Sequence, residues 1–565
     1  MASSYSPTAI IIGAGPGGIS MAYRLKHELG FNDFLVYEKL DGVGGTWRSN
    51  TYPGCGCDLP SHLYSFSFNL NPNWSKELCE QPEILQYIED TVEKFSLREH
   101  IITSVECLGA IWDDDQEEWT VRFRDGQTGV NFERRATVFI SAVGAISLPR
   151  DVKFKGMEVF KGEIFHTAQW NHSVDYTGKR VAVIGNGCSA AQVVPAIAEK
   201  AAFVQQYARS AQWYHARPNK TFSPLEQWAF RWVPLWQRWL RLRIFLQAEQ
   251  ESYTYFSSAD GIKARLAAEE ESREYILSRT TQQYQKAVIP DFPLGCKRRI
   301  FDPGYLDSLH RTNVKLRSEG IQEFTETGTI GSSGVEDRFD IIALATGFQV
   351  SQFLAPMEIY GRHGVSLNKQ WNESKGAQAY YGTFVHNFPN MGIIFGPNSF
   401  PANNSALFAC ETQVCFAVKA LFEPILDRRT KVVEVKHAAE ERHTTSIQEQ
   451  LKGTVFAGDC SNWYFNNYGR NTASWPAKAA FFWLETYFPN WNAFIWKNGS
   501  AAWPIHRIAR WLKTGSWLTK ACLVMAVTVV SHQSKVDGSL GLTVAGMFTN
   551  LHGCLQIQFP SLWAM

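Results

Sequence analysis

Two short glycine-rich segments have the residue types and spacing that hold the pyrophosphate of a dinucleotide. The first, Gly13-Ala-Gly15-Pro-Gly-Gly18, follows the apolar run 9–12 and precedes a helical pattern. Glycine at such a turn lets the backbone approach a pyrophosphate at the start of a helix. Glu38 stands 25 positions after Gly13, at the end of a second apolar run. A carboxylate there can accept hydrogen bonds from ribose hydroxyls, so this strand–turn–helix unit predicts a dinucleotide site.

The second glycine-rich segment repeats this unit with one change of charge. Gly185-Asn-Gly187-Cys-Ser-Ala190 follows the apolar run 180–184, and Ala190 still permits close packing of the helix on the strand. Arg209 stands 24 positions after Gly185, where the first unit has its acid. An acid would repel a 2′-phosphate, whereas a guanidinium can bind it with two hydrogen bonds. We therefore expect FAD at the first turn and NADPH at the second; an ordinary exposed arginine is the alternative for Arg209.

Two nucleotide sites in one chain restrict the chemistry to electron transfer. A nicotinamide gives a hydride, a flavin accepts it, and the flavin passes electrons on singly or to O2. Lys and Arg total 55 against 54 Asp and Glu, and this balance argues against electrostatic binding of nucleic acid. The eleven cysteines include no C-x-x-C pair, which disfavours a zinc ribbon and a dithiol redox centre. We expect reduced cysteines, a cytoplasmic location and no bound metal.

The elements that must position the two turns predict an α/β fold. A chain of 565 residues corresponds to three or four domains of ordinary size. The apolar runs 136–144 and 339–347 each end in glycine, as expected where a chain leaves one nucleotide domain and re-enters it. We expect two Rossmann-like dinucleotide-binding domains, the second inserted in the first. The expected boundaries are an FAD domain at 1–150 and 341–490, an NADPH domain at 151–340 with a helical subdomain at about 222–290, and a tail at 491–565.

The C-terminal tail has a different character. Residues 503–513 are basic and amphipathic, a pattern suited to a membrane surface. The uncharged run 521–534 has 14 residues, fewer than the roughly 20 that a spanning helix needs. We expect a cytoplasmic protein, with weak membrane-surface contact through the tail as an open alternative. The oligomeric state is left open.

Further segments resemble fingerprints of one enzyme family. Residues 44–58, which contain Gly-Gly-Thr-Trp and Tyr-Pro-Gly before a final Asp, resemble the G-G-x-W...Y-P-G-x-x-x-D stretch of Baeyer–Villiger monooxygenases. Residues 160–170 resemble their F-x-G-x-x-x-H-x-x-x-W fingerprint, here followed by Asn171 where Pro or Asp is usual. Lys297-Arg298 looks like the Lys-Arg pair that these enzymes hold beside the flavin. The likeness spans about residues 8–480, and it implies a class B flavin-containing monooxygenase.

The resemblance implies a reaction that can be checked against residue types. NADPH would reduce FAD, O2 would add to give a C4a-peroxyflavin, and attack on an apolar ketone would yield an ester or lactone. The developing negative charge needs a fixed cation that does not titrate, which arginine supplies. Arg298 is the catalytic candidate, Asp58 would pair with it, and Arg299 ranks lower. N- or S-oxygenation or hydroxylation within the same superfamily is the main alternative.

The resemblance also assigns cofactor contacts. Lys297 would assist Arg209 with the 2′-phosphate, Trp463 would contact the nicotinamide half, and His166 would support the linker between domains. The candidate cofactor-binding residues are Gly13, Gly15, Gly18, Glu38, Thr46, Trp47, Asp58, Tyr64, Gly185, Gly187, Ser189, Ala190, Arg209, Ser210, Lys297 and Trp463.

Four tryptophans recur at helical spacing within the expected helical subdomain. They stand at intervals of 4, 4 and 3, and Pro234 must kink or split their helix. We expect them to pack in a core; an apolar wall for a bulky ketone is the alternative. The four are Trp228, Trp232, Trp236 and Trp239.

Overall fold

A parallel five-stranded sheet carries the first glycine turn. The computed structural model describes residues 6–401, 404–427, 429–458 and 462–497. In this sheet the strand order is β19-β7-β1-β2-β3, so strands far apart in the sequence lie side by side. Buried apolar side chains on both faces explain the uninterrupted apolar runs of its central strands. The strands are β1 (Ala9–Ile12), β2 (Phe34–Tyr37), β3 (Ile101–Ile102), β7 (Val138–Ser141) and β19 (Met391–Ile393).

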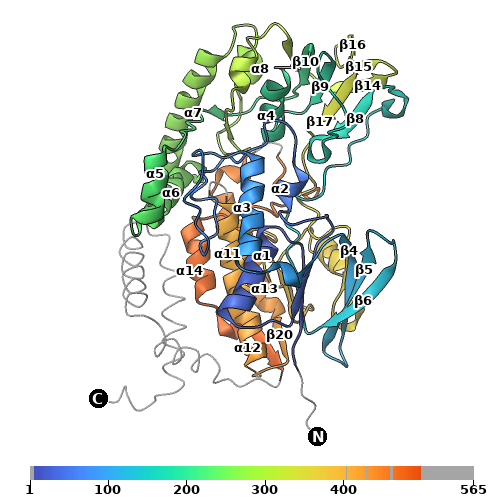
Figure 1. Ribbon diagram of the computed structural model, residues 1–565, viewed down its shortest axis with the longest axis vertical. Helices are drawn as coiled ribbons and strands as arrows, with labels where there is room; N and C mark the ends of the chain where they lie inside the picture. The colour runs from blue at the N-terminus through green and yellow to red at the C-terminus, as the bar shows by residue number, and fades with distance from the viewer. Residues whose placement is uncertain (1–5, 402–403, 428, 459–461, 498–565) are drawn as a thin grey trace.

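Helices from both ends of the described chain surround this sheet (Figure 1). Helix α1 (Pro16–Tyr23) starts at the first glycine turn and packs against α11, which in turn packs against α14. The lower lobe in Figure 1 therefore combines N-terminal and C-terminal segments. Its other helices are α2 (Thr46–Ser49), α3 (Gln81–Lys94), α10 (Leu367–Glu373), α11 (Ala406–Ala417), α12 (Glu423–Leu426), α13 (His437–Lys452) and α14 (Ala479–Tyr487).

Two smaller sheets flank the lower lobe. In the four-stranded sheet β18-β4-β5-β6, three strands form an antiparallel meander and β18 adds in parallel to β4. A two-stranded sheet pairs β20 with β21. The strands are β4 (Val105–Asp113), β5 (Glu118–Asp125), β6 (Asn131–Ala136), β18 (Glu358–Tyr360), β20 (Val432–Val435) and β21 (Phe494–Lys497).

A second parallel sheet, in the upper lobe, carries the second glycine turn (Figure 1). Its order is β13-β10-β9-β17-β8, and helix α4 (Cys188–Ile197) follows β9 directly. Strands β14 to β16 form an antiparallel sheet beside it. The strands are β8 (Glu163–His166), β9 (Arg180–Ile184), β10 (Phe203–Tyr207), β13 (Val314–Arg317), β14 (Ile321–Thr325), β15 (Gly328–Gly331), β16 (Glu336–Arg338) and β17 (Ile341–Leu344), with the short pair β11 (Tyr214–His215) and β12 (Ile300–Phe301) and helix α9 (Tyr305–Ser308) nearby.

Two connections join the sheets, one after β7 and one after β17. They run antiparallel: the Arg150 amide donates to the Gly347 carbonyl at 2.9 Å, and the Gln349 amide donates to the Leu148 carbonyl at 2.9 Å. The chain therefore leaves the first sheet and returns to it through adjacent, hydrogen-bonded segments.

Residues 224–288 form a run of helices, and the expected tryptophan stripe lies on the first two. Helix α5 (Pro224–Trp232) starts with a capping box in which Ser223 and Glu226 bond reciprocally. Pro234 separates it from α6 (Trp236–Glu251), so the predicted split is confirmed. The core-packing prediction is wrong, however, because all four tryptophans are exposed, and none of them lines the central cavity. The remaining helices are α7 (Ala259–Arg279) and α8 (Gln285–Val288).

No helix of the described residues is both long enough and apolar enough to cross a bilayer. The basic segment 503–513 and the apolar run 521–534 lie outside the described residues.

Candidate active site

A cavity of about 1630 Å³ opens between the two parallel sheets. Both glycine turns line it, because both lie at the carboxyl ends of strands that face the same space. A volume of this size exceeds that of an ordinary ligand pocket and suits two extended nucleotides and a small substrate.

The first turn is shaped so that only glycine fits it at two positions. Gly13 has φ of +101°, and a Cβ there would lie 2.7 Å from the Ala142 carbonyl oxygen. A Cβ at Gly18 would lie 1.9 Å from the Gly13 carbonyl oxygen. Gly15 faces the Cα of Gly45 across the cavity edge. The backbone thus offers an uncovered start of helix α1 to a phosphate.

Glu38 follows β2 and lies at the cavity wall, almost fully buried. Its Oε2 accepts a hydrogen bond from the Ala14 amide at 2.7 Å, and its Oε1 accepts one from the Leu40 amide at 2.9 Å. Burial raises the pKa of Glu38, while these backbone donors act in the opposite direction. The two amides orient the carboxylate and leave lone pairs free to accept from ribose hydroxyls.

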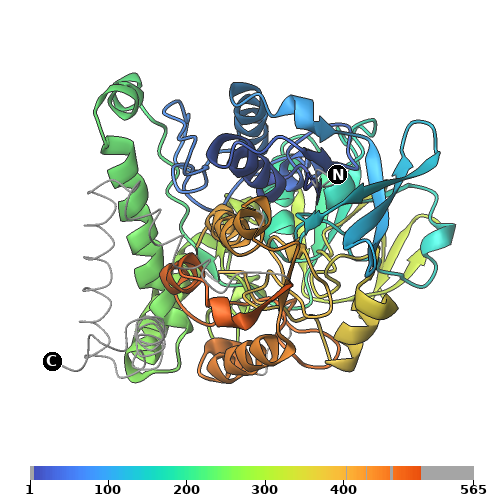
Figure 2. The same cartoon turned by 90° about the horizontal axis from the view of Figure 1, so that it is seen from below.

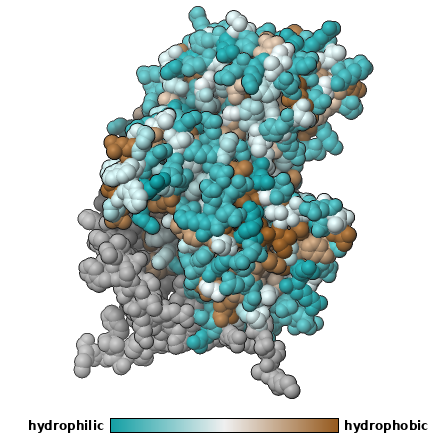
Figure 3. Space-filling view, viewed as in Figure 1, coloured by the Kyte–Doolittle hydropathy of each residue, from teal (hydrophilic) through white to brown (hydrophobic). Residues whose placement is uncertain are grey.

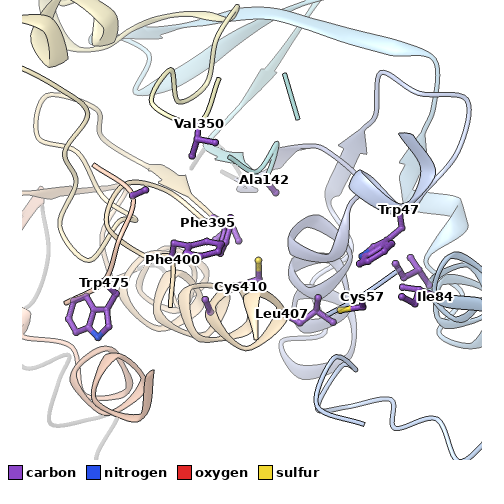
Figure 4. Close-up of a cluster of buried hydrophobic side chains, with 14 of the residues drawn as sticks. Trp47, Cys57, Ile84, Ala142, Val350, Phe395, Phe400, Leu407, Cys410 and Trp475 are labelled. Carbon is purple, nitrogen blue, oxygen red and sulfur yellow. The ribbon is translucent and has the colours of Figure 1, made fainter. Parts of the chain in front are cut away.

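An aromatic wall follows the first turn. Trp47 lies on α2 and donates from Nε1 to the Tyr64 hydroxyl at 2.9 Å, and Thr46 lies beside it at the cavity. Figure 4 shows Trp47 on one side of the buried cluster and Phe395 and Phe400 on the other, with α11 side chains between them. These faces give the cavity flat apolar surfaces suited to an aromatic ring system.

Arg298 and Asp58 form an ion pair inside the cavity, although 240 residues separate them. Arg298 donates from Nε at 3.0 Å and from Nη2 at 2.6 Å, both to Oδ2 of Asp58. Burial pulls the pKa of Arg298 down, but the Asp58 carboxylate outweighs it and the net shift is upward. The guanidinium also lies 5.8 Å from the centre of the Phe400 ring. A permanent, fixed cation therefore faces the cavity.

Arg299 points the other way. It pairs with Glu251 at the end of α6 and lies 5.4 Å from the Phe301 ring centre, and it does not line the cavity. Of the two adjacent arginines, the structure brings Arg298 to the site and places Arg299 in a structural contact.

The second turn also requires glycine at its first position, Gly185, but it has free space at Gly187. Gly185 has φ of +134°, and a Cβ there would lie 2.1 Å from the Ala345 carbonyl oxygen. Ala190 is fully buried behind the turn, and Ser189 faces the cavity at the start of α4. A Cβ at Gly187 would meet no atom within 4 Å, because this glycine borders the cavity itself.

Two cations and a hydroxyl gather at the end of β10. Arg209, Ser210 and Lys297 all line the cavity, and Lys297 Nζ donates to Ser210 Oγ at 3.0 Å. Burial lowers the pKa of Lys297, nearby Asp291 opposes this shift, and the charge of Arg209 adds to it. The neighbouring positive charges of Arg209 and Lys297 are suited to bind an anion such as a 2′-phosphate.

Gln192 was not predicted from the sequence. It lies on α4 and lines the cavity, where its Oε1 accepts from the Tyr52 hydroxyl at 2.7 Å and its Nε2 donates to the Gly56 carbonyl at 2.9 Å. It thus connects the helix of the second turn to the loop that carries Asp58. Its partners lie about 140 residues away in the chain, so no local pattern could have identified it.

Trp463 and His166 have different positions. Trp463 lines the cavity and meets Phe400 edge to face, with ring centres 5.3 Å apart. His166 is buried outside the cavity lining, accepts at Nδ1 from the Ala168 amide at 3.0 Å, and lies 5.9 Å from the Phe348 ring. His166 thus lies beside the connection that follows β17, and its role in supporting the linker between domains stays a prediction.

Cys55 and Cys57, which line the cavity, are not set up for redox or metal chemistry. Cys55 and Cys57 are buried and free, and burial raises the pKa of Cys55 to about 12, so its thiol is neutral. Cys296 is in a disulfide bond, which differs from the fully reduced set expected from the sequence. No group of three metal-ligating side chains occurs among the described residues.

The described residues fit FAD at the first turn and NADPH at the second. Each glycine turn leaves room for a diphosphate. At the first turn the oriented carboxylate of Glu38 matches a free ribose, and at the second the two cations Arg209 and Lys297 match a 2′-phosphate.

The chain is similar to one Rossmann-like domain model and to several known monooxygenases. Residues 11–81 match the model of the NAD(P)-binding Rossmann-like domain. A Baeyer–Villiger monooxygenase of Pseudomonas aeruginosa is 36% identical over 471 residues, covering 82% of this chain and 87% of the relative. The FAD-binding monooxygenase ktnD of Aspergillus niger is 32% identical, covering 88% of this chain and 83% of the relative.

Solved structures agree with these relatives. A cyclohexanone monooxygenase from Rhodococcus sp. Phi1 bound to NADP+ matches with a TM-score of 0.75 at 27% identity, over 87% of this chain and 100% of that chain. A steroid monooxygenase bound to NADP matches with a TM-score of 0.74 at 26% identity, over 88% of this chain and 100% of that chain.

Proposed function

The chain belongs to the Baeyer–Villiger monooxygenase family, and from that premise we propose that it inserts one oxygen atom of O2 into an apolar ketone. It is an FAD-binding monooxygenase that uses NADPH. The product would be an ester or a lactone. The observation that carries the proposal is the fixed cation, Arg298, held by Asp58 in the cavity that both glycine turns share.

Bound FAD would accept a hydride from NADPH and activate O2 for transfer of one oxygen atom. The chain's own contribution is to place and stabilise the reacting groups. Attack on a ketone carbonyl builds negative charge on its oxygen, and a pre-oriented guanidinium lowers the energy of that charge. Because arginine does not titrate in the working range, Arg298 keeps its charge at every pH of interest.

Asp58 is a positioning residue in this proposal. Both hydrogen bonds to it use the same carboxylate oxygen, so the guanidinium keeps one nitrogen, Nη1, without a bond to Asp58. That nitrogen can donate to a developing oxyanion while the pair holds the plane of the guanidinium.

We propose that Arg209, Ser210 and Lys297 select NADPH over NADH. All three lie where the adenosine end of a nucleotide at the second turn would reach, and their combined charge matches a 2′-phosphate. Trp463 and Phe400 would then border the nicotinamide half.

The domain boundaries follow the same division. We propose that residues 1–150 and 341–490 hold FAD and that residues 151–340 hold NADPH. The two antiparallel connections after β7 and β17 support this assignment, because they are the segments through which the chain passes between sheets.

An apolar ketone suits the remaining wall of the cavity. Phe395, Phe400, Val350 and Leu407 line the cavity, the Phe400 ring centre lies 5.8 Å from the Arg298 guanidinium, and Figure 4 shows the two phenylalanines side by side. An apolar substrate would gain from displacing water at these side chains, while its carbonyl oxygen alone requires the cation.

The test replaces Arg298 with alanine. We expect ketone oxidation to fall by about 10²- to 10³-fold or more, as for loss of an oxyanion-stabilising group, with reduction of the flavin by NADPH retained. Products from a panel of ketones, sulfides and amines are identified by mass spectrometry, and flavin reduction is followed by stopped-flow absorbance. Arg299→Ala is the matched control, because it removes the neighbouring guanidinium that lies outside the cavity; its melting temperature measures the loss of the structural pair with Glu251.

Each result has a clear meaning. Ketone turnover that survives in Arg298→Ala would contradict the assigned role. Sulfide or amine oxygenation by the wild type, without any ketone product, would support the heteroatom-oxygenating alternative instead.

A further inference from the structure

The exposed face of helices α5 and α6 is unusual in composition. Nine of the twenty exposed large apolar side chains of the described residues lie within residues 225–246, and every exposed tryptophan of the described residues is among them. Within the described part of the chain these helices lie at one edge in both ribbon views (Figures 1 and 2), and Figure 3 shows apolar side chains at that edge. The outward face comprises Trp228, Trp232, Leu235, Trp236, Trp239 and Leu242.

Helix α6 is held to the molecule largely through polar side chains. Gln237 Nε2 donates to the Asn71 carbonyl at 2.6 Å, and Arg241 Nη1 donates to the Ser65 carbonyl at 2.7 Å. The ring centre of Phe245 also lies 4.9 Å from that of Phe408. Glu249 accepts from the Asn404 side chain at 2.8 Å. A helix solvated by water places its apolar stripe toward the core, whereas α6 points that stripe outward. The outward face is therefore suited to an apolar partner.

The charge of this segment identifies the partner. Residues 227–248 contain four arginines and no acidic residue, and Arg231, Arg238 and Arg243 are exposed. Arg243 lies 5.4 Å from the Trp239 ring centre, so the basic and aromatic side chains are interleaved. The carboxylate of Glu77 lies near Arg243: burial raises the pKa of Glu77, and the charge of Arg243 acts in the opposite direction. Tryptophan and arginine on one helix face are typical of the interface of an anionic bilayer.

Two other occupants are disfavoured by the same charges. The C-terminal segment 498–565 has five Lys or Arg residues and one Asp, so it repels a basic face. A second copy joined by a two-fold axis would present the same basic face, so arginines of one copy would oppose arginines of the other. An anionic lipid surface attracts both the segment and the face.

We propose that the outward face of α5 and α6 binds the surface of an anionic phospholipid bilayer. Helix α6 has 16 residues, which corresponds to about 24 Å lying along the surface. The tryptophans insert at the level of the headgroups, and the three exposed arginines pair with lipid phosphates and carboxylates. Glu249 on the inward face of α6 holds Asn404, which lines the cavity, so one helix separates the bound lipid from the active site.

The experiment measures co-sedimentation of the full-length protein with vesicles of phosphatidylcholine mixed with phosphatidylserine, and with vesicles of phosphatidylcholine alone. We expect binding to the mixed vesicles that weakens as salt is raised. The variant Arg231→Gln/Arg238→Gln/Arg243→Gln should lose about fivefold in partition coefficient for each arginine removed, or about 100-fold in all. The variant Trp232→Ser/Trp236→Ser should bind both kinds of vesicle more weakly than the wild type.

A matched control removes the same charge elsewhere. Arg124→Gln/Arg134→Gln/Arg135→Gln changes three exposed arginines on β5 and β6 and should bind nearly as the wild type does. All variants should keep the wild-type melting temperature and the wild-type rate of NADPH oxidation with a dissolved substrate, because the substituted side chains are exposed.

Three results would overturn the proposal. The first is a wild-type protein that does not bind mixed vesicles. The second is full binding by the α5–α6 arginine variant together with loss of binding in Arg507→Gln/Arg510→Gln/Lys513→Gln, which would place the contact in the tail. The third is dimerisation of the wild type that Trp232→Ser abolishes, without binding to vesicles, which would make the face a subunit interface.

Discussion

Replacing Asp58 with asparagine separates the charge of Arg298 from its position. The side chain keeps its shape and one carbonyl acceptor, but it loses the negative charge that Nε and Nη2 of Arg298 contact at 3.0 and 2.6 Å. At these distances the gross attraction is about 5 kcal/mol for an effective dielectric constant near 20. Arg298 stays largely desolvated, but the charge of Asp58 no longer has to be, and the amide still accepts one hydrogen bond. Both side chains are also partly exposed, so we expect a loss of about 1–3 kcal/mol in the free energy of unfolding.

We expect Asp58→Asn to lower kcat for ketone oxidation by misplacing Arg298, not by changing its protonation state. Asp58 raises the pKa of Arg298, so its removal lowers that pKa, but from a value so high that the guanidinium stays protonated. We therefore expect kcat for ketone oxidation to fall about 10- to 100-fold through lost orientation, with no new limb in the pH profile. More NADPH should be consumed per product formed.

The assay compares product formation with NADPH consumption across pH, and denaturant unfolding measures stability. Unchanged kcat and coupling in Asp58→Asn would refute the positioning role. A new ionisation within the assayed pH range would refute the argument that arginine keeps its charge.

Three further predictions concern the two nucleotide sites. Arg209→Ala should raise the KM for NADPH by about 10- to 100-fold, the worth of a charge-assisted hydrogen bond, and leave the KM for NADH nearly unchanged; equal effects on both would contradict the 2′-phosphate assignment. Gly13→Ala should lower the melting temperature and the FAD content, because its Cβ would lie 2.7 Å from a carbonyl oxygen. Gly187→Ala should melt as the wild type does but bind NADPH less tightly, because its Cβ would enter the cavity; normal NADPH binding by this variant would argue against a nucleotide at the second turn.

The two nucleotide turns show what a local pattern can determine. A strand, a glycine turn and a helix are contiguous in sequence and identify both turns, although the carbonyl oxygens that exclude a Cβ at Gly13 and Gly185 belong to Ala142 and Ala345, far along the chain. Glu38 and Arg209 follow at a fixed distance because the second strand of each unit pairs with the first in parallel. These features were therefore predictable before any tertiary structure was known.

The resemblance to the family directed attention to Arg298, but sequence alone does not distinguish it from its neighbour. Adjacent side chains of an extended segment point to opposite sides. Which side faces the cavity depends on Asp58, 240 residues away, and on Glu251, which takes Arg299. Gln192 was missed for the same reason, since its partners Tyr52 and Gly56 come from another part of the chain.

The tryptophan stripe shows the same division between sequence and tertiary structure. The spacing of Trp228, Trp232, Trp236 and Trp239 correctly predicts helix, and Pro234 correctly predicts the break. The expectation of a core failed because periodicity identifies the face of a helix but not what covers it. Polar side chains of α6 donate to the Asn71 and Ser65 carbonyls, and large apolar side chains of the helix are left on the outward side.

The sequence by itself thus determined the two glycine turns and their order along the chain, because the strand, the turn and the helix of each unit are contiguous in sequence. The tertiary structure decided that Arg298 and not Arg299 faces the cavity, that Gln192 links α4 to the loop carrying Asp58, and that the tryptophans of α6 are exposed. Those outcomes depend on contacts between segments more than a hundred residues apart, and no local pattern encodes them.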